Sequence, residues 1–302
     1  MGKTAFVFAG QGAQYSGMGQ SLCENFTTVK NLYDAANAVR PGTTEQSFYG
    51  TDAELKQTIN TQPCVFLADL AAALALNERG VKADMCAGFS LGELAALAYS
   101  GVFSHTDAFE AVCARAKCMD KAAKEMDGEP AMAAVMKLTA EEVEGLCDGL
   151  DNVYPVNYNS PGQTAISGTK AGIEAFCEKA AGVRVVPIPV SGAFHSPFMA
   201  AASLEFENVL TKYEINTPAI PVYANLTGEV YPDDVKACLA AQMKSPVRWQ
   251  TTIEHMIADG ADTFIECGPG KTLAGLIKRI DKTVKVYSVQ DTDSLEAVLA
   301  AL

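Results

Sequence analysis

The sequence is poor in basic side chains. Its 302 residues include 23 lysines and arginines against 36 aspartates and glutamates, which gives a net charge of −13. Proteins that bind nucleic acid normally present a basic face, so this balance argues against a nucleic-acid partner. No apolar run reaches the roughly 18 residues of a membrane helix. The first residues also lack the apolar stretch of a signal peptide. We therefore expect a cytoplasmic protein without membrane contact.

Histidine and paired cysteine are also scarce. Only three histidines occur, and the nine cysteines are scattered, odd in number and free of any Cys-x-x-Cys pair. A zinc site needs clustered cysteine and histidine ligands, so no metal is expected. Reduced, buried thiols are the expected state. Apolar residues, in contrast, make up 49% of the chain, which excludes disorder and is enough to bury a large core.

Short apolar runs alternate with helical patterns along most of the chain. Strands are predicted at 4–9, 83–87, 220–224, 263–267 and 284–289. Helices are predicted at 62–79, 93–100, 105–125, 235–243, 249–258, 271–280 and 294–302, and a further helix is expected to begin at Pro197. This alternation favours an α/β fold with a mostly parallel sheet.

The middle of the chain has a different order of elements. Strands at 131–138, 153–158, 163–167 and 183–190 are interleaved with helices at 139–146 and 170–181. The order strand, helix, strand, strand, helix, strand is that of a ferredoxin-like unit. We therefore predict a small domain at 124–189, inserted into a large α/β domain made of 1–123 and 190–302.

A Gly-x-Ser-x-Gly motif, Gly88 to Gly92, lies between a predicted strand and a predicted helix. In a nucleophile elbow the chain turns so sharply that only glycine fits on either side of the serine. The serine then projects at a helix N-terminus, where backbone N–H groups can stabilise an oxyanion. The motif predicts Ser90 as a nucleophile; a tight glycine-rich turn without catalysis is the alternative.

A serine nucleophile needs a base, and only three histidines are available. His105 lies in a helix-capping segment and His255 in an amphipathic helix, so both are expected at the surface or the edge of the core. His195 lies in a loop that leads from a strand into a helix. Catalytic residues of α/β folds collect in such loops. We predict His195 as the base; a structural loop histidine is the alternative.

Two more features point to a substrate site. The loop from Gly10 to Gln14 follows the first strand, and its glycines would let backbone N–H groups approach a substrate or a phosphate, although the Walker pattern is absent. Arg115 shares a helical stripe with apolar residues. A buried guanidinium is costly unless an anion pairs with it. That anion is either a substrate carboxylate or an internal partner, and a snorkelling side chain is a third possibility.

Taken in order, these motifs resemble the malonyl-CoA:acyl carrier protein transacylase family from Phe8 to about Leu276. They are Phe8–Gln14, Gln62-Pro63, Gly88–Glu93, Arg115 with Met119, Ala131–Val135, Asn157–Gly168, Ser191–Met199, Gln242–Trp249 and Glu266–Gly270. The resemblance implies an α/β-hydrolase-like large domain with an inserted ferredoxin-like domain. One position departs from it. The family usually has histidine before the serine, whereas this chain has Phe89, which puts in doubt the shape or polarity of the acyl pocket.

The resemblance also implies roles for individual residues. Ser90 would attack the thioester while His195 takes its proton, and the backbone carbonyl of Gln242 would orient the imidazole. The remaining implied site residues are Gln11 and Leu91, whose N–H groups hold the oxyanion; Arg115, which binds the malonyl carboxylate; Gln62 and Met119 beside it; and Phe194, which resembles the residue of members that select malonyl over methylmalonyl.

The implied reaction is ping-pong transfer of malonyl from malonyl-CoA to the phosphopantetheine thiol of acyl carrier protein, for fatty acid elongation, by a monomer without a cofactor. An acyltransferase serving a polyketide synthase is one alternative. A serine thioesterase or esterase is another, although it needs neither Arg115 nor an inserted domain. A non-catalytic carrier-binding module would not need Ser90 and His195. Because both substrates are anionic, a rim of basic side chains is expected where they bind. The candidates for this basic rim are Lys244, Arg248, Lys271, Lys278 and Arg279; the alternative is that they are only a solvated face.

Overall fold

The larger part of the protein is built around a parallel sheet. The computed structural model describes residues 2–302. Five parallel strands lie in the order β7-β2-β1-β8-β9, with β1 in the centre. Their bounds are Lys3–Phe8 (β1), Met85–Gly88 (β2), Val222–Tyr223 (β7), Ala261–Cys267 (β8) and Lys285–Val289 (β9). The predicted α/β fold is confirmed, and the carboxyl ends of β1, β2 and β8 meet at one edge of the sheet.

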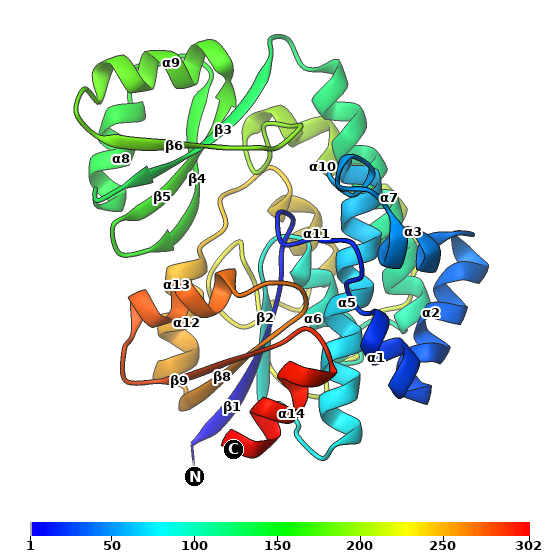
Figure 1. Ribbon diagram of the computed structural model, residues 1–302. Coiled ribbons are helices and arrows are strands. Elements are labelled where there is room, and N and C mark those ends of the chain that lie inside the picture. The colour runs from blue at the N-terminus through cyan, green and yellow to red at the C-terminus, as the bar shows by residue number, and fades with distance from the viewer. Residues whose placement is uncertain (1) are drawn as a thin grey trace.

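Helices cover both faces of this sheet (Figure 1). Side chains alternate along a strand, so Phe6 and Phe8 of β1 face one layer while Ala5 and Val7 face the other. The first layer contains α5 (Thr58–Glu78), α6 (Gly92–Tyr99), α7 (His105–Glu125), α10 (Ala200–Leu210), α11 (Val235–Gln242) and α14 (Thr292–Ala301). The second layer contains α12 (Trp249–Ala258) and α13 (Thr272–Ile280). The sheet is thus buried on both sides, which explains its continuous apolar runs.

The segment between the first strand and α5 contains four helices that the sequence analysis did not predict. They are α1 (Gln20–Asn25), α2 (Thr27–Val39), α3 (Thr43–Tyr49) and α4 (Asp52–Leu55). Three of them are at most 7 residues long, too short for a helical period to stand out. They pack on α5 through buried apolar residues, among them Leu22, Phe48 and Leu55.

The predicted start of the helix at 62–79 was wrong. Helix α5 begins at Thr58, not at 62, and keeps Pro63 inside it. The helix expected to begin at Pro197 does begin there, as a short 3-10 turn, η1 (Pro197–Met199), that continues into α10. Helix α5 is also long and apolar enough to cross a membrane, contrary to our expectation. However, 89% of its most apolar 18-residue stretch is buried inside the protein, as in a core helix.

A second, antiparallel sheet has the strand order β4-β5-β3-β6. Its strands are β3 (Pro130–Met136), β4 (Val153–Ser160), β5 (Gln163–Thr169) and β6 (Arg184–Ile188). Helices α8 (Ala140–Cys147) and α9 (Lys170–Lys179) pack on one face around Val143 and Phe176. This confirms the ferredoxin-like unit, which extends from the end of α7 in Figure 1. We propose 124 and 189 as its boundaries, because 124 lies in the last turn of α7 and 189 directly follows β6.

Candidate active site

The turn between β2 and α6 has the geometry of a nucleophile elbow. Ser90 has a positive φ of 55°. A Cβ atom on Gly88 would lie 1.9 Å from backbone atoms of Gly92, and one on Gly92 would lie 2.3 Å from the carbonyl oxygen of Phe8. Neither position can hold a side chain without moving backbone. The two glycines therefore let the elbow press against the central strand and present Ser90 at the carboxyl edge of the sheet.

The structure brings Ser90 and His195 together. The Oγ atom of Ser90 lies 2.7 Å from Nε2 of His195, and Nδ1 of His195 lies 2.9 Å from the backbone carbonyl oxygen of Gln242. Since a carbonyl only accepts, Nδ1 carries the proton and Nε2 is left to accept one from the serine. Burial, followed by the charge of Arg115, lowers the pKa of His195 to about 4. The imidazole is therefore neutral at pH 7 and able to act as a base.

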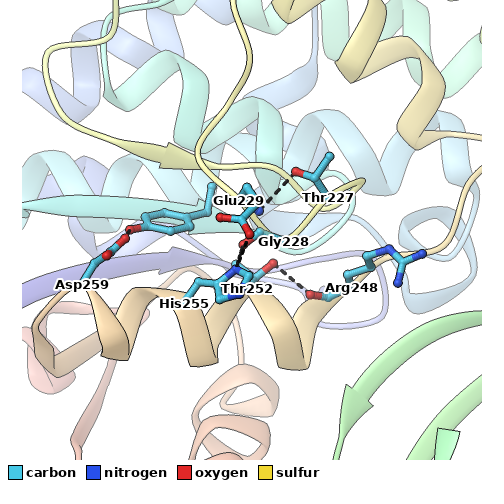
Figure 2. Close-up of polar contacts among 8 residues, drawn as sticks. Thr227, Gly228, Glu229, Arg248, Thr252, His255 and Asp259 are labelled. Carbon is cyan, nitrogen blue, oxygen red and sulfur yellow. Dashed lines mark hydrogen bonds and ion pairs between the residues drawn. The ribbon is translucent and has the colours of Figure 1, made fainter.

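The other two histidines lie elsewhere. His255, on α12, has Nδ1 2.9 Å from the carbonyl oxygen of Gly228 and 3.3 Å from a carboxylate oxygen of Glu229 (Figure 2). His105 is the first residue of α7. Neither lines the cavity beside Ser90. Among the three histidines, only His195 is in hydrogen-bonding distance of the serine.

Two backbone N–H groups beside Ser90 are free to bind a ligand. Gln11 follows β1, and Leu91 directly precedes α6. Within residues 2–302, neither backbone N–H donates an internal hydrogen bond. The loops that carry them are joined by a 3.0 Å bond from the N–H of Phe89 to the carbonyl oxygen of Phe8. Unpaired donors of this kind can stabilise the negative oxygen that forms when a carbonyl is attacked.

Arg115 is completely buried behind Ser90. Its NH1 group donates to Oε1 of Gln62 at 2.9 Å, and its NH2 group donates to Oε1 of Gln242 at 2.9 Å and to Oγ of Ser90 at 3.2 Å. No carboxylate in the described part of the chain forms an ion pair with it. Burial lowers the pKa of Arg115 to about 10, so it stays cationic at pH 7. Of the three sequence-based interpretations, snorkelling and a direct internal salt bridge are therefore wrong.

A cavity of about 290 Å³ lies between the two sheets, in front of Ser90. From the larger part, its lining includes the predicted residues Gln11, Gln62, Ser90, Met119, Phe194 and His195; the small sheet contributes Met132, Ala134, Asn157 and Asn159, among others. The predicted residues Leu91, Arg115 and Gln242 are buried beside or behind this lining. Phe89 also lines the cavity, with its ring edge-on to Trp249 at 5.4 Å. The cavity wall is thus aromatic where the family usually has an imidazole.

The five candidates for a basic rim are all exposed. Arg279, on α13, donates to Oε1 of Gln163, a residue of the cavity lining. Arg248 lies 5.8 Å from the centre of the Tyr158 ring. Lys278 donates to the carbonyl oxygen of Val284 at 3.2 Å. A docking role for these residues stays a prediction.

Two residues that the sequence analysis did not single out support the elbow. Asn225 accepts a hydrogen bond from the N–H of Ser90 at 2.7 Å and donates to the carbonyl oxygen of Gly88 at 2.6 Å. Glu93 accepts from the N–H of Asn225 at 3.1 Å and from the amide of Gln242. Burial raises the pKa of Glu93 to about 7. Glu93 stands within a motif quoted above, whereas the only local signal for Asn225 is a polar residue at the end of a strand.

Comparison with known proteins agrees with this site. The chain matches the acyl transferase domain family over residues 5–298. It is 37% identical to the malonyl CoA-acyl carrier protein transacylase of Bacillus subtilis over 312 residues, covering 100% of this chain and 98% of the relative.

Solved structures give the same result. The malonyl CoA-acyl carrier protein transacylase of Clostridium perfringens superposes with a TM-score of 0.94 at 38% identity, covering 99% of this chain and 96% of the other. A malonyl-transacylase solved in complex with its type II PKS acyl-carrier protein has a TM-score of 0.93 at 34% identity, covering 99% of this chain and 100% of the other. The chain therefore belongs to the acyl transferase domain family and, within it, to the malonyl CoA-acyl carrier protein transacylases.

Proposed function

We propose that this protein transfers a malonyl group from malonyl-CoA to the phosphopantetheine thiol of acyl carrier protein. The observation that carries this proposal is the position of Arg115, a fully buried cation without a carboxylate partner, 3.2 Å from Oγ of Ser90. A malonyl thioester has its free carboxylate two carbons from the carbonyl that the serine attacks. Arginine binds carboxylates through paired N–H groups, so one substrate can meet both residues.

In the first half-reaction Oγ of Ser90 attacks the thioester carbonyl carbon, and its proton passes to Nε2 of His195. The carbonyl oxygen becomes negative and is held by the N–H groups of Gln11 and Leu91. When this intermediate collapses, the carbon–sulfur bond breaks and the coenzyme A sulfur takes the proton from His195. The products are coenzyme A and a malonyl ester of Ser90.

The second half-reaction reverses these roles. The phosphopantetheine thiol gives its proton to His195 and its sulfur attacks the ester carbonyl. The bond to Oγ of Ser90 breaks, and the serine regains its proton from the imidazole. The carbonyl of Gln242 keeps Nδ1 protonated throughout, so Nε2 is the only ring nitrogen that exchanges a proton.

The wider role that we propose is malonyl supply for fatty acid chain elongation, by a cytoplasmic monomer. The alternative carrier is that of a polyketide synthase, since one relative is a malonyl-transacylase in complex with its type II PKS acyl-carrier protein. The chemistry at Ser90 is the same for both. Side-by-side transfer rates to a fatty acid carrier and to a polyketide carrier would separate them.

The test of the activity is the intact-protein mass after brief mixing with malonyl-CoA in the absence of an acceptor. We expect one malonyl adduct on the wild-type protein and none on Ser90→Ala, and the adduct should disappear when acyl carrier protein is added. Steady release of free malonate without an adduct would identify a thioesterase. No adduct and no turnover would contradict any acyltransferase role with this donor.

A further inference from the structure

A guanidinium and a carboxyl group lie buried behind Ser90 without touching each other. Arg115 and Glu93 are each 0% exposed, and no ion pair joins them. The side-chain amide of Gln242 lies between them. Its oxygen accepts from NH2 of Arg115 at 2.9 Å, and its nitrogen donates to a carboxylate oxygen of Glu93. Arg115 and Glu93 are therefore linked through one amide instead of by direct contact.

The direction of this amide is decided by its neighbours. A glutamine amide has an accepting end and a donating end, and its orientation follows from the groups that face it. Arg115 can only donate. The carbonyl oxygen of Ser90, 2.7 Å from the Gln242 nitrogen, can only accept, and an ionised Glu93 also only accepts. All three contacts require the same direction, with the amide oxygen toward Arg115.

Glu93 is itself fixed by a second donor. Its other carboxylate oxygen accepts from the backbone N–H of Asn225 at 3.1 Å. A carboxylate satisfies both donors, but an amide of the same shape cannot. In Glu93→Gln, an NH2 group would have to face either the N–H of Asn225 or the amide nitrogen of Gln242. If Gln242 turned to avoid this contact, its own NH2 group would face Arg115.

We propose that Glu93 is a positioning residue for the carboxylate-binding site, acting through Gln242. The Glu93 carboxylate fixes the Gln242 amide, and the amide oxygen holds the guanidinium of Arg115 beside Ser90 while leaving the cation without a direct anionic partner. A direct ion pair would occupy the donors that a substrate carboxylate needs. This inference rests on the proposed malonyl transfer, since it concerns the group that distinguishes malonyl from acetyl.

The test compares two donors on the same variants. For wild type and Glu93→Gln, we would measure kcat/KM for acylation of Ser90 by malonyl-CoA and by acetyl-CoA. The ratio of kcat/KM for malonyl-CoA to that for acetyl-CoA should fall about tenfold or more in Glu93→Gln. The substitution misplaces a hydrogen bond to a charged group, and only malonyl-CoA uses Arg115. Asp69→Asn is the matched control. Asp69 is also 0% exposed but lies on α5, outside the cavity lining, so the ratio should not change.

The outcomes separate this inference from the function on which it rests. Wild-type protein that is not acylated by malonyl-CoA would contradict the function itself. Wild-type acylation together with an equal loss for both donors in Glu93→Gln, or with no loss for either, would overturn the role of Glu93. If Glu93→Gln fails to fold, Gln242→Met removes the amide but keeps the backbone carbonyl that binds His195. Selective loss of malonyl would then support the inference, and equal loss would overturn it.

Discussion

Ser90 and His195 are joined by a 2.7 Å hydrogen bond, and both have a backbone conformation that residues with side chains rarely adopt. Their φ angles are 55° and 60°. Such strained positions persist only where the surroundings fix them. Asn225 binds the N–H of Ser90, and the carbonyl of Met243 accepts from the N–H of His195 at 3.1 Å. The backbone of each residue is thus fixed by a hydrogen bond, and the two side chains are already paired before a substrate arrives.

Replacing His195 by alanine should nearly abolish acylation. Without the imidazole, no other histidine can take the Ser90 proton, because His105 and His255 do not line the cavity. We expect the acylation rate with malonyl-CoA to fall by roughly 10²–10⁴-fold. Rapid-quench mass spectrometry measures this rate directly. Wild-type rates in the variant would exclude His195 as the base.

The buried state of His195 predicts an unusual pH profile. Only the neutral imidazole can accept the proton, and burial lowers the pKa of His195 to about 4. The neutral fraction, and with it the acylation rate, should stay constant as the pH falls through 6.5 and should drop only near pH 4. Acetyl-CoA is the donor to use, because its acyl group has no carboxylate for Arg115. Because the pKa of Glu93 is about 7, the same profile is measured for Glu93→Gln; a drop centred near pH 6.5 in both proteins would mean that His195 titrates as if exposed.

Arg115→Ala should change the preference between donors. The substitution removes the cation that is expected to bind the malonyl carboxylate, but the methyl group of acetyl needs no such partner. Acylation by malonyl-CoA should fall by at least about tenfold, while acylation by acetyl-CoA should be retained or improved. Initial rates of adduct formation with the two donors measure the change. Equal losses for both donors would contradict a carboxylate-binding role.

Local sequence was sufficient to predict the elbow and the ferredoxin-like unit. In both cases the signal is contained in neighbouring residues: two glycines around a serine in one, and a fixed order of strands and helices in the other. Arg115 could be noticed in the same way, because it interrupts an apolar helical stripe. The resemblance to a known family assigned the oxyanion role to Gln11 and Leu91, where local patterns indicated only a glycine-rich loop and a helix N-terminus. It also added a role for Gln242, which no local pattern indicates.

The rest of the site depends on long-range contacts. Asn225 is 135 positions from Ser90 in the sequence, and the amide of Gln242 is 149 positions from Glu93. Their meeting depends on the pairing of β7 with β2 and on the packing of α11, neither of which has a periodic signature. The four helices between β1 and α5 were missed for a related reason, since tertiary packing stabilises them more than their own sequence does.

Asn225→Ala should impair catalysis more than binding. The side chain holds both the N–H of Ser90 and the carbonyl of Gly88, so its loss frees the elbow and displaces the neighbouring N–H of Leu91. Loss of one oxyanion donor typically costs about 10²–10³-fold in rate. We expect kcat to fall by roughly 10²-fold with a small change in KM.

The control for this change is Asn77→Ala. Asn77 also makes a partly buried hydrogen bond, in which it accepts from the hydroxyl of Tyr99 at 2.8 Å. It lies on α5, outside the cavity lining. The Asn77→Ala protein should lose some stability against unfolding and keep the kcat and KM of the wild type. If Asn225→Ala behaves like this control, the Asn225 side chain does not position the nucleophile.

Gly92→Ala should destabilise the fold itself. The added Cβ atom would lie 2.3 Å from the carbonyl oxygen of Phe8 and 2.6 Å from that of Ala9, and backbone atoms of a central strand cannot move aside cheaply. We expect a loss of about 3 kcal/mol or more in the free energy of unfolding, measured by urea denaturation. Gly145→Ala provides the contrast. Gly145 lies inside α8 with nothing within 4 Å of an added Cβ atom, so alanine should raise stability by about 0.5 kcal/mol. A Gly92→Ala protein as stable as the wild type would show that the elbow does not press against β1 as closely as these distances require.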